Sequence, residues 1–114
     1  MNLRITHIKC LVNDEIDGDE IYLKYGGKKI WPAGLFKGIK TDETTVIDLE
    51  LTVSNEQFTT IELWEYDLLS GNDFMGTFDM LVNEEGGPFQ TSLKLKSDSF
   101  RASYLLTWEA IQDN

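Results

Sequence analysis

Acidic side chains gather in two short segments of this 114-residue chain. In the first segment, residues 14–20, five of the seven residues are Asp or Glu. In the second, Glu65 and Asp67 precede a Ser-Gly-Asn sequence and Asp73 follows it. Calcium takes about six to eight oxygen ligands, so a site for it needs several carboxylates held together. The two segments are therefore candidates for a calcium site, although each one alone is also typical of a solvated turn.

The first segment does not fit an EF-hand loop. Gly18 would have to be the sixth residue of that twelve-residue loop, which makes Lys24 its last residue. The last position requires a carboxylate that binds the ion through both oxygens, so a lysine there excludes the motif. A calcium site in this chain would have to be built from loops between strands.

Strands are the elements that must position these acids. Residues 45–53 show the clearest pattern, because apolar side chains at 47, 49, 51 and 53 alternate with mostly polar ones. A short strand is expected near Ile30, and no segment keeps a helical period over three turns. The stretch 34–43 is the most loop-like. Further β-rich runs, bounded by turn residues, lie at about 3–12, 20–30, 59–67, 74–82, 89–97 and 101–111.

About eight strands at this regular spacing predict one antiparallel sandwich or small barrel that spans residues 1–114. Glu65 and Asp67 are two residues apart near the end of a predicted strand, so their side chains should leave the same face of it. Asp73 follows the turn and can fold back toward them. We therefore predict that three carboxylates converge at one end of the domain.

Residues 63–76 read Leu-Trp-Glu-Tyr-Asp-Leu-Leu-Ser-Gly-Asn-Asp-Phe-Met-Gly. This run resembles the signature apolar-Trp-Asp-x-Asp-x-x-Ser-x-Asn-Asp-Phe-x-Gly of the C2 domain, the calcium- and phospholipid-binding module of protein kinase C and the synaptotagmins. The family also has two acids six residues apart in an earlier loop, and the second opens an Asp-Pro-Tyr-Val-Lys run. Here that run is similar to residues 20–24, Glu-Ile-Tyr-Leu-Lys, and Asp14 lies six residues before Glu20.

The resemblance implies an all-β, eight-stranded antiparallel Greek-key β-sandwich of the C2-like type. The strand order looks like that of the type II members found in phospholipases. The resemblance also implies calcium as a cofactor. Family members carry Asp at the positions of Glu20 and Glu65, and the extra methylene of Glu moves the carboxylate by about an ångström. The implied ligands are Asp14, Glu20, Glu65, Asp67 and Asp73, with Ser70 as a weaker one.

C2 domains dock on membranes through side chains at their loop tips, and the equivalent residues here are Leu68 and Leu69, with Ile16 on the first loop. A leucine pair exposed between acids would be unusual on an inert surface. The alternative is that one or both leucines fold inward. The resemblance thus makes Ile16, Leu68 and Leu69 the candidate membrane contacts.

Composition narrows the possible functions. The formal net charge is −10, which argues against nucleic acid as a partner. His7 is the only histidine, and no nucleophile motif accompanies it, so we expect no enzymatic activity. Cys10, the only cysteine, lies in an alternating run and is expected to be buried. We find no signal peptide or transmembrane segment, which favours a cytoplasmic protein with possible peripheral membrane association.

Two functions remain open at this point. The first is a calcium-binding module that associates with an anionic phospholipid membrane when calcium is bound. The second is a calcium-independent protein-interaction or assembly scaffold, a subunit of a larger complex with a protein partner.

Overall fold

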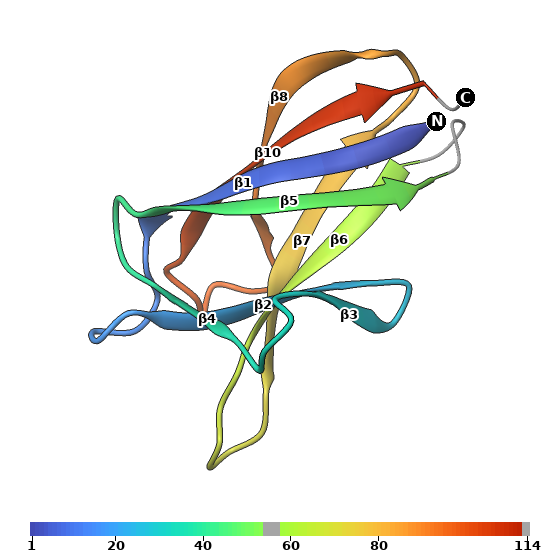
Figure 1. Ribbon diagram of the computed structural model, residues 1–114. Coiled ribbons are helices and arrows are strands. Elements are labelled where there is room, and N and C mark those ends of the chain that lie inside the picture. Colours follow the sequence, from blue (N-terminus) through green and yellow to red (C-terminus); the bar gives the residue numbers. More distant parts are fainter. Residues whose placement is uncertain (54–57, 113–114) are drawn as a thin grey trace.

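Two antiparallel sheets form the computed structural model of this chain, which describes residues 1–53 and 58–112 (Figure 1). The four-stranded sheet has the order β5-β1-β10-β8. Its strands are β1 (Asn2–Val12), β5 (Thr44–Thr52), β8 (Gly86–Ser92) and β10 (Ser103–Ile111). The six-stranded sheet has the order β3-β2-β6-β7-β9, with β4 also paired to β2. Its strands are β2 (Asp19–Tyr25), β3 (Lys28–Trp31), β4 (Lys37–Ile39), β6 (Phe58–Glu65), β7 (Asp73–Leu81) and β9 (Lys94–Leu95).

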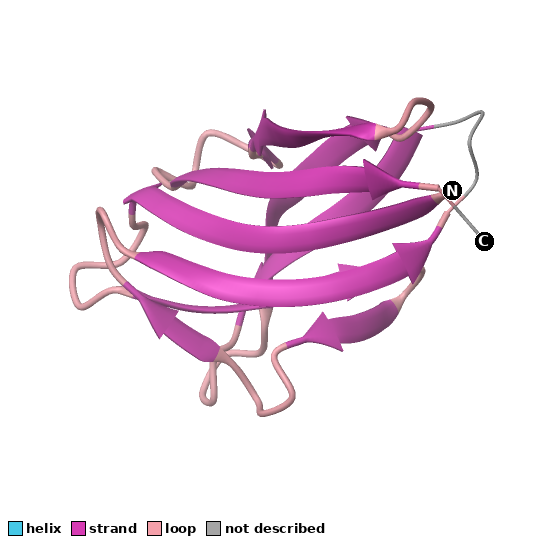
Figure 2. Cartoon of the chain, turned by 45° about the horizontal axis from the view of Figure 1, so that its top comes forward, coloured by secondary structure: helices cyan, strands magenta, loops and turns pink. Residues whose placement is uncertain are grey.

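The predicted all-β sandwich is confirmed, and Figure 2 shows only strands and loops in the described part of the chain. The structure has ten strands where the sequence predicts eight. The additional two are β4, inside the stretch expected to be a loop, and β9, which is separated from β8 by Leu93. They contain three and two residues, which is too short for an alternating pattern to be recognised.

Alternation along the strands builds the core between the sheets. On β1 the buried side chains include Leu3, Ile5 and Ile8, and Cys10 is buried as predicted. On β6, Ile61 and Leu63 are fully buried and face the same interior. Because side chains at every second position share a face, the next inward position on β6 belongs to Glu65.

Two loops carry most of the residues singled out from the sequence. Residues 13–18 join β1 to β2, and residues 66–72 join β6 to β7. Both loops lie on the side of the molecule away from the termini (Figure 1). We call the region formed by these two loops and the adjoining strand ends the loop end.

Candidate functional site

Asp19 is buried at the base of the loop end, where it begins β2. Its side chain continues the inward face of Ile21 and Leu23, and it is only 1% exposed. Both carboxylate oxygens of Asp19 accept the backbone N–H of Asp14, at 3.0 and 2.9 Å, and Oδ1 also accepts the N–H of Glu15 at 3.0 Å. The hydroxyl of Tyr104, on β10, donates to Oδ2. Asp19 therefore joins the first loop to the opposite sheet.

Glu65 ends β6 and is the second buried acid of this region. Its side chain is 3% exposed, because it follows Ile61 and Leu63 on the inward face. Burial, followed by hydrogen bonding to Glu15 and the charge of Asp19, raises the pKa of Glu65 to about 9. Among the described residues, its Oε2 has no hydrogen-bond partner. Glu65 is therefore protonated at neutral pH.

Asp14 and Glu20, the predicted ligands of the first segment, face different surroundings. Asp14 Oδ1 accepts the backbone N–H of Arg101 at 2.7 Å, so this carboxylate attaches the first loop to the chain just before β10. Glu20 is exposed, and it leaves β2 on the face opposite to Asp19. The backbone carbonyl of Glu20 accepts the N–H of Tyr66 at 2.7 Å, which places the second loop next to β2.

The second loop folds around Asp67. Its Oδ1 accepts the N–H of Leu69 at 2.9 Å and that of Ser70 at 3.2 Å, and its Oδ2 accepts the Ser70 hydroxyl. These hydrogen bonds, that of the hydroxyl first, lower the pKa of Asp67. We predicted that Glu65 and Asp67 leave one face of a strand, but β6 ends at Glu65 and Asp67 lies in the loop. Asp73 is exposed at the start of β7, directly opposite Glu65 in the pairing.

The loop tips are strongly apolar and open to solvent. Ile16 is 100% exposed, Leu68 81% and Leu69 94%. The alternative considered from the sequence, that the leucines fold inward, is therefore not what the structure has. Large apolar side chains that are almost fully exposed are typical of surfaces that bind something else.

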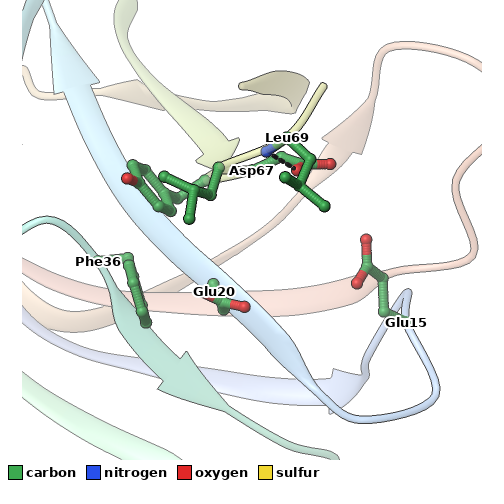
Figure 3. A pocket seen from close by; sticks show the side chains of 7 residues that line it. Glu15, Glu20, Phe36, Asp67 and Leu69 are labelled. Carbon is green, nitrogen blue, oxygen red and sulfur yellow. Dashed lines mark hydrogen bonds between the residues drawn. The ribbon is translucent and has the colours of Figure 1, made fainter. Parts of the chain in front are cut away.

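A pocket of about 490 Å³ opens beside the second loop (Figure 3). Its carboxylates are Glu15, Glu20 and Asp67, and Leu68 and Leu69 form part of its wall. The remaining wall is the ring pair of Phe36 and Tyr66, whose centroids are 5.2 Å apart with the rings nearly parallel. The pocket thus combines acids, aromatic rings and the exposed leucines in one place.

The comparison that bears on this arrangement is structural. A C2 domain of plant extended synaptotagmin 1, the one designated A, superposes with a TM-score of 0.52 and 13% sequence identity, over 98% of this chain and 95% of that one. This chain has a C2-like fold. No protein-family model matches its sequence. No curated protein matches it either.

For a C2-like fold the implied metal is calcium, and the acids as they stand do not fit one. In residues 1–53 and 58–112, no group of three or more Asp, Glu, His or Cys side chains is arranged to hold a metal ion. Glu20 points away from the interior that holds Glu65, and Asp67 is hydrogen-bonded within its own loop. The ligand set of Asp14, Glu20, Glu65, Asp67, Ser70 and Asp73 stays a prediction that requires these contacts to be exchanged.

The sequence reasoning missed three residues of this C2-like loop end. Asp19 was passed over for Glu20, although its alternation with Ile21 and Leu23 marks it as inward-facing. Phe36 lies in the stretch expected to be a loop, and no local pattern pairs it with Tyr66. In the described part of the chain, no helix is long and apolar enough to cross a bilayer.

Proposed function

We propose that this chain is a C2-like binding module that associates with phospholipid membranes through its loop end. The observation that carries the proposal is the exposure of Ile16, Leu68 and Leu69 on the two loops. Burying an apolar side chain of this size in an apolar environment contributes about 1.5–3 kcal/mol. Three such side chains would supply a useful part of the free energy of membrane association.

The ligand set implied by the C2 resemblance adds calcium to this proposal. Calcium at Asp14, Glu20, Glu65, Asp67, Ser70 and Asp73 would reduce the repulsion between the acidic chain, of net charge −10, and an anionic membrane. We propose this calcium dependence as a second, separable part of the function. It requires Glu65 to lose its proton and Asp67 to leave its hydrogen bonds to the loop.

The membrane part is tested by flotation of the whole chain with vesicles that contain phosphatidylcholine and an anionic phospholipid. The test variant is Leu68→Ser with Leu69→Ser, and the matched control is Val46→Ser, because Val46 is an exposed apolar residue on β5 of the other sheet. We expect the double variant to lose at least about tenfold in vesicle affinity and the control to bind like the wild type. Equal binding by both variants would reject the loop end as the membrane contact.

The calcium part is tested by thermal melting with calcium, magnesium or chelator, on the wild type and on Asp67→Ala with Asp73→Ala. A ligand that binds only the folded state raises the midpoint of melting. We expect a calcium-specific rise in the wild type that the double variant lacks. If millimolar calcium leaves the wild-type midpoint unchanged, the calcium dependence is wrong, while vesicle binding in chelator would leave the membrane part intact.

A second candidate function is calcium-independent binding of a protein partner. The observation that favours it is Glu65, which is buried and protonated instead of being presented to an ion. A protein partner would be indicated by vesicle binding that is absent with and without calcium, together with an unchanged melting midpoint.

A further inference from the structure

The pocket beside the second loop has the chemical character of a cation site. Three of its lining residues, Glu15, Glu20 and Asp67, carry carboxylates, and none of its lining residues is basic. In Figure 3 the Glu15 and Glu20 side chains extend into the space between Phe36 and the loop that carries Asp67 and Leu69. Electrostatics therefore favour a positively charged occupant.

The ring pair narrows the kind of cation. Phe36 and Tyr66 come from different segments of the chain and pack with their centroids 5.2 Å apart. The Phe36 ring is still 38% exposed, so part of it is available to a ligand. Aromatic rings attract cations through their negative faces, and this attraction is strongest for weakly hydrated organic cations such as quaternary ammonium groups. A ring-lined acidic wall thus favours an organic cation over a strongly hydrated metal ion.

The size of the pocket and the arrangement of its acids agree with that choice. A volume of about 490 Å³ lies within the usual range for small organic ligands, which is about 300–1,000 Å³. The described acids do not form a group that could hold a metal ion. Asp67 is hydrogen-bonded to the backbone of Leu69 and Ser70, so it stiffens one wall of the pocket. Glu15 and Glu20 are the carboxylates that face the occupant.

We propose that this pocket binds the quaternary ammonium group of a phosphocholine headgroup. The inference rests on the proposed membrane association, since Leu68 and Leu69 line the pocket and also form the exposed tip that would enter the membrane. A purely anionic headgroup would be repelled by the acidic lining and by a net charge of −10. In phosphocholine the positive group is the outer end of the headgroup, so it meets the acids first.

The ligand chemistry is tested with free choline and with its neutral analogue, in which a tert-butyl group replaces the trimethylammonium group. Both are titrated into the whole chain in chelator and followed by NMR. We expect choline to shift resonances of Phe36 and Tyr66 and to bind at least about tenfold more tightly than the neutral analogue. Equal affinity for the two compounds, or no binding of choline, would overturn the proposal.

Variants assign the binding to this pocket. Phe36→Leu, Tyr66→Leu and Glu20→Gln should each weaken choline binding by about threefold or more. The matched control is Phe89→Leu, because the Phe89 ring is 41% exposed but packs on Trp108 in the other sheet. The far-ultraviolet circular dichroism of each variant shows whether it is folded. If the folded pocket variants bind choline like the wild type, the proposed pocket is wrong.

Vesicles separate the failure of this inference from that of the proposed function. In chelator, we expect the wild type to prefer phosphatidylcholine vesicles to phosphatidylglycerol vesicles, and the pocket variants to lose this preference. Leucine-dependent binding to vesicles without any headgroup preference would overturn the inference and leave the membrane proposal standing. Binding of free choline without binding to any vesicle would overturn the assignment to a lipid and the membrane proposal together.

Discussion

The base and the tip of the loop end carry the same kind of side chain in opposite surroundings. At the base, Asp19 and Glu65 are buried between the sheets, where Asp19 accepts hydrogen bonds from Tyr104 and from two backbone N–H groups. At the tip, Glu20 is exposed, and Asp67 is hydrogen-bonded only to neighbouring residues of its own loop. Burial, not residue type, separates the two groups.

This difference assigns different work to the two regions. A buried acid holds the structure together only if its partners are complete, because an unpaired polar group in the interior costs free energy. The acids at the tip are free of that requirement and can meet a ligand. We therefore expect changes at the base to alter stability and changes at the tip to alter binding, and the following predictions are ordered by their expected effect on the free energy of unfolding.

Asp19→Ala should have the largest effect. The variant leaves the N–H groups of Asp14 and Glu15 and the Tyr104 hydroxyl without their acceptor, and we expect a loss of about 3 kcal/mol. Urea denaturation measures the loss. The control is Asp17→Ala, an exposed acid of the same loop, which should stay within about 0.5 kcal/mol of the wild type. Equal effects of the two variants would remove the distinction between base and tip.

Glu65→Gln should change how stability depends on pH. The unfolded chain releases this proton near pH 4.5 and the folded protein keeps it until about pH 9, so the folded state binds more protons between these values. Its stability therefore falls as pH rises through this window. Because glutamine does not ionise, we expect the variant to gain about 2 kcal/mol over the wild type between about pH 5 and pH 8.

The measurement is urea denaturation of both proteins across that pH range. Asp73→Asn is the matched control, because Asp73 pairs with Glu65 across the strands but is exposed. Its difference from the wild type should not vary with pH by more than about 0.5 kcal/mol. A pH-independent difference for Glu65→Gln would show that Glu65 is ionised in the folded protein.

Tyr104→Phe removes only the hydroxyl that donates to Asp19. We expect a loss of about 1 kcal/mol, smaller than that of Asp19→Ala because the backbone donors keep their acceptor. In the double variant with Asp19→Ala, the two losses should not add, and the coupling should be about 1 kcal/mol. Additive losses would show that the hydroxyl and the carboxylate do not stabilise the protein through each other.

Leu68→Ser with Leu69→Ser should have the smallest effect on stability. Both side chains are almost fully exposed, so we expect the free energy of unfolding to change by no more than about 0.5 kcal/mol. Leu63→Ala, at a fully buried position on β6, is the contrasting change and should cost about 3 kcal/mol. A large loss on changing the tip leucines would mean that they are packed in solution, and would contradict the proposed membrane contact.

The sandwich could be predicted because its pattern is local. Alternating apolar residues and turn residues mark the long strands, and the resemblance at residues 63–76 anticipates the C2-like fold. Strands β4 and β9 could not be predicted, since two or three residues carry no period. They are strands only because a longer neighbour offers them hydrogen bonds.

For the loop end, residue types and their spacing were enough to identify the two acidic loops, the leucine tip and the candidate ligands. How each acid is used depends on the folded arrangement. Asp19 and Glu20 are neighbours of the same chemical type, yet one is buried against Tyr104 and the other is exposed. Phe36 and Tyr66 form one wall only because two distant segments meet. Burial and partners come from contacts between residues far apart in the chain, so a local pattern could name these acids and rings but not assign their surroundings.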